Sequence, residues 1–464
     1  MFLATITFNR NKMQLYLASI LGLPALGLGA AVSSRSDSTY NGPLFSRSDI
    51  SIAEAPSEGL VQLNQNPKPD HFRSPVRSRI AAQRVGKRAG TGNATVNTLF
   101  SGIYPTVNLT WGNTDGSPGQ QFISFIDTGS SDSWVVSSDL QCVDIETKVP
   151  LSQDACGFGP LYDSAAGSFT NITDESFSIS YFPEGEALKG DMGYAPITLG
   201  GLTVPKQQVA LVNYAAWIGD DSSSGLLGLG YPAITSGKNR TSGRYVEYDP
   251  LFTTMIKEKV VSNGIFTLVI DRVPQGTSPL APAGLMALGG LVPASYYEAP
   301  FTSVPIVKDG SEYTWYTVDA TFKYGTNGSI TEFATTGSFE TIVDSGTSPN
   351  FIPTAAAKAL NAQFDPPAVY NATLDYYVVD CDATAPYAAY VVGGVEMPMD
   401  PQDMIVRSLN GLPGYEDVCF SAFADGGPNT PGSSFIIGAV WQRSYVVAYD
   451  QMRSMMHFAK RTPY

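Results

Sequence analysis

Histidine is nearly absent from this sequence, which holds only His71 and His457 among its 464 residues. Ser-His-Asp and Cys-His catalytic sites need an imidazole beside the nucleophile, and a zinc site needs clustered His or Cys ligands. His71 falls in a segment that we expect to be removed by processing, and we expect His457, alone near the C-terminus, to be structural. The Gly-rich stretch 225–230 lacks the βαβ context of a dinucleotide-binding fingerprint. The sequence therefore predicts no metal and no cofactor.

Long hydrophobic runs are also missing, with one exception near the N-terminus. Residues 15–32 read LYLASILGLPALGLGAAV and follow Arg10 and Lys12. A basic start, an apolar run and small residues near its end are typical of a secretory signal peptide, which we place at residues 1–31. A transmembrane anchor is the alternative, although Pro24 and the glycines of the run disfavour it. No later segment is apolar enough to span a bilayer, so we expect no membrane anchor after signal removal. We predict a secreted, extracellular protein, with a vacuolar destination as the alternative.

Cysteine is scarce and even in number, which in a secreted chain is typical of disulfides. Four cysteines allow three pairings, and we favour the local ones, Cys142 with Cys156 and Cys381 with Cys419. Six Asn-X-Ser/Thr sequons agree with passage through a secretory pathway. The candidate glycosylation sites are Asn93, Asn108, Asn171, Asn239, Asn327 and Asn371.

Positive charge is in short supply, because 28 Lys and Arg stand against 42 Asp and Glu. The imbalance is uneven: residues 32–88 carry a net charge of +4, whereas residues 89–464 carry −20. Nucleic acid is an unfavourable partner for so acidic a body. Residues 32–88 end in Lys87-Arg88, which suits a dibasic processing protease unless the pair is fortuitous. We therefore predict that 32–88 is a prosegment that the acidic body holds electrostatically as an intramolecular inhibitor.

The remaining composition favours strands over long helices. Glycine (45) and proline (32) are abundant, and 43% of the residues are hydrophobic. Frequent turn formers among strand-forming residues indicate a mostly β protein with many short strands. At this length the chain exceeds one ordinary domain.

Two short stretches repeat each other. Residues 125–131 read FIDTGSS, and residues 342–348 read IVDSGTS, 217 positions later. Each has two apolar residues, an Asp, a hydroxyl residue, a Gly and two more hydroxyl residues. An apolar-apolar-Gly echo follows each copy, ending at Gly228 and at Gly438, which lie 101 and 94 residues after the respective Asp. Two echoes in the same order predict a duplicated architecture. A carboxylate behind a buried strand is costly unless it has a partner, and Asp344 of the second copy is the candidate partner of Asp127.

With these motifs the chain resembles the pepsin-type (family A1) aspartic peptidases over essentially all of residues 100–464. The resemblance implies a bilobal fold, two β-rich lobes related by pseudo-twofold duplication with the active-site cleft between them. We place the N-terminal lobe at residues 89–285 and the C-terminal lobe at 286–464. The implied activity is hydrolysis of peptide bonds at acid pH by a water between Asp127 and Asp344. The implied partners are polypeptides in extended conformation, and we expect a monomer.

The resemblance also assigns roles to the flanking residues. Thr128 and Ser345 would link the two loops beneath the acids, and Ser130 and Thr347 would hydrogen-bond the carboxylates. Gly129, Gly346 and Ser348 would lie against the substrate. The stretch FSISYFPEGEALKG resembles the flap hairpin, with Tyr181 as the flap tyrosine and Trp134 as its support.

Two expectations remain open at this point. The flap tip contains Pro183 and Glu184 and is longer than is usual in the family, which leaves substrate preference undefined. A pepsin-fold binding or inhibitor protein without activity is the alternative function, because fold alone does not fix function. Loss of an acid or of the flap tyrosine would indicate that alternative, and both acids and Tyr181 are present.

Overall fold

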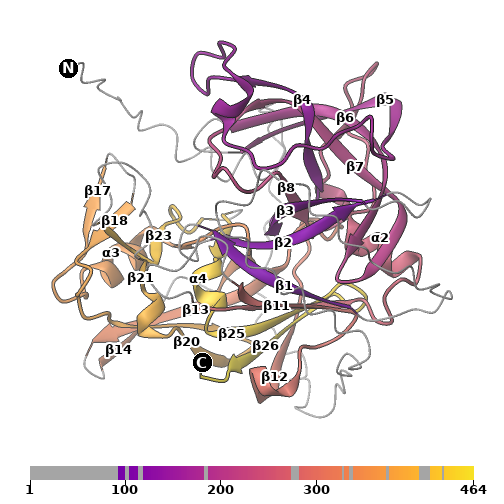
Figure 1. Cartoon of the computed structure of the whole chain (residues 1–464). Coiled ribbons are helices and arrows are strands. Elements are labelled where there is room, and N and C mark those ends of the chain that lie inside the picture. Colours follow the sequence, from indigo (N-terminus) through magenta and orange to yellow (C-terminus); the bar gives the residue numbers. More distant parts are fainter. Residues whose placement is uncertain are drawn as a thin grey trace, which may run out of the picture.

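The structure, a computed structural model, describes residues 92–99, 104–112, 119–181, 186–272, 282–326, 329–333, 338–372, 376–406, 418–430 and 433–463. The predicted signal peptide and prosegment lie outside these residues. The described part is mostly strand, as predicted, and forms three sheets (Figure 1). None of its helices has the length and apolar character needed to cross a membrane.

The largest sheet has 14 strands and runs through the whole molecule in the order β12-β26-β25-β10-β11-β1-β2-β3-β8-β4-β7-β6-β5-β9. Its strands are β1 (Gly92–Leu99), β2 (Tyr104–Trp111), β3 (Gln120–Asp127), β4 (Trp134–Val143), β5 (Thr170–Tyr181), β6 (Glu186–Leu199), β7 (Leu202–Ala216), β8 (Gly225–Gly228), β9 (Gly237–Asn239), β10 (Ile265–Ile270), β11 (Pro282–Leu288), β12 (Tyr297–Pro305), β25 (Tyr445–Asp450) and β26 (Met455–Arg461).

Two smaller sheets are formed by strands of the second half of the chain. The eight-stranded sheet has the order β20-β19-β13-β15-β24-β16-β23, with β14 paired to β13, and the four-stranded sheet has the order β17-β18-β22-β21. Their strands are β13 (Thr317–Thr326), β14 (Ser329–Phe333), β15 (Phe339–Val343), β16 (Asn350–Ile352), β17 (Val369–Asn371), β18 (Tyr376–Val379), β19 (Tyr387–Val392), β20 (Val395–Pro398), β21 (Ile405–Val406), β22 (Cys419–Ser421), β23 (Phe423–Asp425) and β24 (Phe435–Ile437).

Helices in the described part are short. The α-helices are α2 (Leu251–Lys257), α3 (Thr354–Asn361) and α4 (Ala439–Gln442). Short 3-10 helices occupy Gln153–Cys156, Pro232–Ile234, Ala294–Tyr296 and Pro401–Asp403. Helix α3 is built from alanine and leucine with few competing polar residues, which favours helix, and it buries Ala356, Ala357 and Leu360.

Strands from both halves of the chain pair at the centre of the large sheet. Every residue of β10 and of β25 is buried, as expected for a strand covered on both faces. The last two strands, β25 and β26, pair with β10 and β12 respectively, so residues near the C-terminus lie in the same sheet as β1, with β10 and β11 between β25 and β1 (Figure 1). The lobe boundary expected between 285 and 286 falls inside β11 and stays a prediction.

Candidate active site

The two aspartates end equivalent pairs of parallel strands. Asp127 is the last residue of β3, which runs parallel to β8 with Gly228 opposite the aspartate. Asp344 directly follows β15, which runs parallel to β24 with Val343 opposite Ile437. The apolar-apolar-Gly echoes of the sequence are therefore the neighbours of the aspartate-bearing strands. The duplication seen in the sequence is a duplication of this strand pair.

Both carboxyl groups are nearly buried, Asp127 at 9% exposure and Asp344 at 6%. Each accepts the same two hydrogen bonds: the backbone N–H two residues later donates to Oδ1, and the hydroxyl three residues later donates to Oδ2. The four donors and their distances are Gly129 N at 2.8 Å, Ser130 Oγ at 2.5 Å, Gly346 N at 2.8 Å and Thr347 Oγ1 at 2.6 Å. The carboxylates are therefore fixed by symmetrical contacts.

Beneath the acids, Thr128 and Ser345 bind the two loops to each other. The Thr128 hydroxyl accepts from Ser345 N at 2.9 Å and donates to Val343 O at 2.9 Å. The Ser345 hydroxyl accepts from Thr128 N at 3.2 Å and donates to Ile126 O at 2.7 Å. Both side chains are fully buried, so each hydroxyl satisfies a backbone amide and a carbonyl that water does not reach. The structure thus places both residues at the junction where the sequence predicts them.

The two glycines show how closely the loops interlock. A Cβ atom on Gly129 would lie 2.6 Å from Asp344 Cγ, and one on Gly346 would lie 2.6 Å from Asp127 Cγ. Any side chain at either position would displace the aspartate of the other loop. The glycines therefore bring the acids together across the pseudo-twofold axis.

Burial controls the electrostatics of the pair. Loss of hydration raises the pKa of Asp127, against the hydrogen bonds from Ser130 and Gly129. Burial, together with the nearby charge of Asp127, raises the pKa of Asp344 to about 7. The two carboxyl groups share a hydrogen bond that favours the charged form of Asp127 and the neutral form of Asp344. The arrangement therefore favours one proton on the pair.

An aromatic cluster lies beside the acids. Trp134 Nε1 donates to Tyr181 Oη at 3.0 Å. Trp217 packs edge-on against both rings, with centroid distances of 5.8 Å to Trp134 and 5.7 Å to Tyr181. Phe158 stacks on the far side of Trp217 at 5.8 Å. Tyr181 is the last residue of β5 and pairs with Glu186 of β6, which identifies a hairpin at this point. The tip itself, including Pro183 and Glu184, lies outside the described residues.

Comparisons with known proteins agree on one family. The model of the family described as "Eukaryotic aspartyl protease" matches residues 114–461. A probable aspartic-type endopeptidase of Aspergillus fumigatus is 34% identical over 390 residues, 82% of this chain and 83% of that protein. The chain belongs to the eukaryotic aspartyl protease family. It is an aspartic-type endopeptidase, and its substrates are polypeptides.

This protease is also similar to more distant relatives. Pepsin A of Rhinolophus ferrumequinum is 28% identical over 350 residues, which cover 74% of this chain and 78% of that protein. The crystal structure of an aspartic proteinase from Irpex lacteus has a TM-score of 0.62 and covers 80% of this chain and 98% of that one. At 19% identity the latter shows the shared fold alone.

Sequence reasoning missed two tryptophans at the site of the protease. Trp315, at 4% exposure, donates from Nε1 to the carbonyl oxygen of Gly129 at 3.0 Å and so holds the first aspartate loop from the second half of the chain. Trp217 packs against Tyr181, as described above. No local pattern marks either residue, because each is placed by pairing between distant strands. The sequence offered only a weak signal, namely that both are tryptophans next to a strand, Trp217 after β7 and Trp315 before β13.

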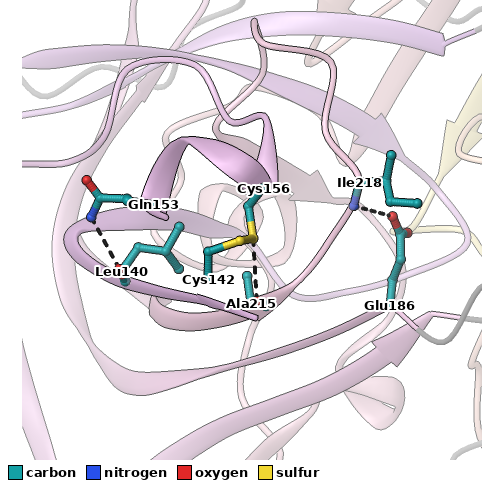
Figure 2. Close-up of a disulfide and its surroundings, with 7 residues drawn as sticks. All are labelled: Leu140, Cys142, Gln153, Cys156, Glu186, Ala215 and Ile218. Carbon is teal, nitrogen blue, oxygen red and sulfur yellow. Dashed lines mark hydrogen bonds between the residues drawn. A yellow bond between two sulfur atoms is a disulfide. The ribbon is translucent and has the colours of Figure 1, made fainter. Parts of the chain in front are cut away.

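The structure forms the two local disulfides, Cys142–Cys156 and Cys381–Cys419. Figure 2 shows the first beside the end of β7, where Cys156 Sγ lies 3.5 Å from the Ala215 carbonyl oxygen. Ala215 pairs with Cys142 on one side and with Leu188 of β6 on the other. The disulfide therefore secures the strands that carry the base of the flap hairpin.

A backbone contact beside the disulfide also bears on the flap. The N–H of the exposed Ile218 donates to Glu186 Oε1 at 3.2 Å (Figure 2). Glu186 is the first residue of β6, directly after the flap tip. The chain that leaves β7 is thereby tied to the base of the flap, next to Trp217.

The remaining predicted residues are Ser348 and the candidate glycosylation sites. Ser348 is half-buried in the second loop, and its carbonyl oxygen accepts from Val440 N at 3.1 Å. Among the candidate glycosylation sites, Asn171 is exposed, whereas Asn108, Asn239 and Asn371 are half-buried. Asn327 and the side chain of Asn93 lie outside the description. Within the described residues, no three His, Cys, Asp or Glu side chains gather as a metal site would require.

Proposed function

We propose that this protease is a secreted, acid-active endopeptidase, made as a zymogen, in which Asp127 and Asp344 activate a water molecule. The observation that carries the proposal is the interlocked pair of buried carboxyl groups, each held by an amide and a hydroxyl. Two carboxyl groups this close share one proton, which is the general behaviour of the aspartate pair in aspartic proteases. One acid and one base are then available at the same site.

The shared proton gives the two acids complementary roles. The ionised member of the Asp127–Asp344 pair serves as the general base that takes a proton from the attacking water. The protonated member donates its proton to the oxygen of the scissile carbonyl. Attack gives a tetrahedral gem-diol, and its collapse transfers a proton to the leaving amine.

The substrate would lie extended over the two glycine loops and under the flap. Backbone hydrogen bonds suit an extended peptide, with alternate side chains directed to opposite sides. Gly129 and Gly346 present backbone without side chains at the acids. Tyr181, held by Trp134 and Trp217, is positioned to cover the substrate, and Ser348 would contact it from the second loop.

The zymogen proposal rests on the charge distribution. The basic segment 32–88 precedes a strongly acidic body, and acidification neutralises the carboxylates that would hold it. Cleavage after Lys87-Arg88 would then release the segment. Replacement of both residues by alanine is expected to leave the precursor uncleaved during secretion at neutral pH, which a mass measurement of the secreted protein checks. Normal maturation of that variant would contradict the processing site.

The decisive experiment is cleavage of an unfolded protein by purified, leader-free enzyme between about pH 2.5 and 7.5. We expect activity confined to acid pH and abolished by a statine-type transition-state analogue. D127N and D344N are each expected to lower kcat by about 10²-fold to 10⁴-fold, because general acid–base catalysis contributes an effect of that size. Cleavage by D344N at the wild-type rate would contradict the assigned site.

A further inference from the structure

The segment Ser130–Trp134 connects the aspartate to the flap support, and other elements of the fold hold it in place. The Ser131 hydroxyl donates to Tyr231 O at 2.6 Å, and Ser133 O accepts from Ala210 N of β7 at 3.0 Å. At its ends, Ser130 binds the carboxylate of Asp127 and Trp134 binds Tyr181. A shift of this segment would therefore move both the acid and the flap contact.

Asp132 is the ionisable residue in the middle of this segment, and it is 1% exposed. Its Oδ1 accepts from Ser236 N at 2.9 Å and from Tyr248 Oη at 2.5 Å. Its Oδ2 is buried and has no hydrogen-bond partner in the described part of the chain. The backbone of β8 lies directly against Asp132, because a Cβ on Gly228 would be 2.6 Å from Asp132 N. The backbone at Asp132 is thus packed against β8, and its side chain is buried.

Acidic groups surround this carboxyl group. The titratable groups that act on it or on its partner are Asp127 at the end of β3, Tyr248, Tyr181 of the flap hairpin and Glu175 of β5. All of these are acids, and among the described residues Asp132 forms no ion pair with Lys or Arg. Burial raises the pKa of Asp132, the charge of Asp127 adds to the rise, and the hydrogen bonds from Ser236 and Tyr248 oppose it. An ionised Asp132 would be a buried charge without compensation.

We propose that Asp132 is a positioning residue that holds the segment Ser130–Trp134 in place in its neutral form, and that its ionisation loosens this segment and limits activity on the alkaline side. Asp132 does not touch the reacting atoms. It acts through Asp127, whose loop it fixes, and through Trp134, which supports Tyr181.

The direction of the effect follows from linkage. The pKa of the carboxyl group is raised in the ordered state and ordinary in the loosened state. The group's contribution to the stability of the ordered state is therefore complete below the ordinary pKa. This contribution is lost as pH rises through the raised pKa. An asparagine at 132 keeps one acceptor oxygen for Ser236 and Tyr248 but does not ionise. Tyr248→Phe removes a hydrogen bond that favours the charged form, so it widens the pH range over which stability falls.

Three variants of the mature enzyme test this proposal: D132N, Y248F and, as a matched control, D139N at an exposed site on β4. The fall in Tm from acid to neutral pH is expected to be smaller in D132N, larger in Y248F and unchanged in D139N. In peptide hydrolysis, the alkaline limb of kcat is expected to move up by roughly half a pH unit or more in D132N. A residue that is merely structural would change Tm equally at every pH.

Equal falls in Tm for wild type, D132N and Y248F would overturn the proposal. If D132N is not recovered folded, the comparison of Y248F with wild type decides, and an equal fall again overturns it. The kinetic readout rests on the proposed function, whereas the Tm readout uses no substrate. If the protein is inactive but the Tm changes follow the expected order, the proposed catalytic function is contradicted and the structural role of Asp132 is supported.

Discussion

At the scale of single residues, the hydroxyls of Thr128 and Ser345 are the smallest features on which the site depends. Each is buried, and each accepts from a backbone amide and donates to a backbone carbonyl of the other loop. Both side chains are fully shielded from solvent. They act by leaving no backbone group of the junction without a partner, which matters because an unpaired buried group costs about 1–3 kcal/mol.

Replacement of Thr128 by valine keeps the shape of the side chain and removes its hydroxyl. Ser345 N and Val343 O then lose their partner, so we expect the free energy of unfolding to fall by about 2–4 kcal/mol, and kcat to fall as the loops separate. Thr128→Ser retains the hydroxyl and is the control, with a change below about 1.5 kcal/mol. Urea denaturation and peptide hydrolysis measure both. Equal stability of the two variants would show that the junction does not depend on this hydroxyl.

The indole of Trp134 supplies a second prediction at this scale. Trp134→Phe keeps an aromatic ring but removes the donor to the buried oxygen of Tyr181. We expect kcat/KM to fall roughly tenfold, since a typical hydrogen bond contributes about 1 kcal/mol and the flap tyrosine also becomes less well placed. Steady-state kinetics with Tyr181→Phe and the double variant check the coupling. Fully additive effects of the two substitutions would contradict a shared contact.

Residues that repeat in sequence were predictable, and residues placed by tertiary structure were not. Asp127 and Asp344 stand in two copies of one pattern, and the family resemblance that this pattern carries implies that they meet. Trp217 and Trp315 occur once each and reach the site by the pairing of distant strands. Single-copy contacts of this kind have no periodic or spaced signal.

At the scale of elements, the two disulfides close loops of different length. Cys142–Cys156 spans 14 residues and Cys381–Cys419 spans 38. Because a longer loop loses more entropy on closure in the unfolded chain, serine substitution of the second pair is expected to cost about 4 kcal/mol and of the first about 3 kcal/mol.

For activity we expect the opposite ranking of the two disulfides, because only the first lies beside the flap hairpin. The shorter loop anchors β4 and β7 beside the flap hairpin, so we expect kcat/KM to fall for the Cys142 and Cys156 variant and to hold for the other. Denaturation and hydrolysis assays on both double variants compare them. Loss of activity confined to the Cys381 and Cys419 variant would contradict the anchoring of the flap by the first disulfide.

The sequence predicted the kind of secondary structure but not which strands pair. The Gly- and Pro-rich, β-forming composition indicated a mostly β protein, and β10 and β25 read as apolar runs that suit fully buried strands. The partnership of β25 with β10 was not readable, because the two strands lie far apart in sequence and pair through backbone groups that every residue carries.

At the scale of the whole molecule, the buried acids make stability depend on pH. The pKa of Asp344 is raised from 3.8 to about 7, so its contribution to stability is present below pH 3.8 and is lost as pH rises toward 7. A tenfold change in acidity corresponds to about 1.4 kcal/mol, so the whole rise in pKa gives roughly 4 kcal/mol as an upper bound. We expect D344N to show a smaller fall in unfolding free energy between about pH 4 and pH 7 than the wild type. Equal falls in urea denaturation would assign the pH dependence to other groups.

The return of β25 and β26 to the middle of the large sheet has a consequence for biosynthesis. Strand β10 stays unpaired on one side until β25 has been translated, close to the end of the chain. A nascent chain therefore exposes an apolar strand edge from the synthesis of β10 until that of β25, and such an edge is a template for pairing with other chains. Folding of the central sheet has to wait for β25, and a premature stop just before β25 would leave a chain without its closing strands.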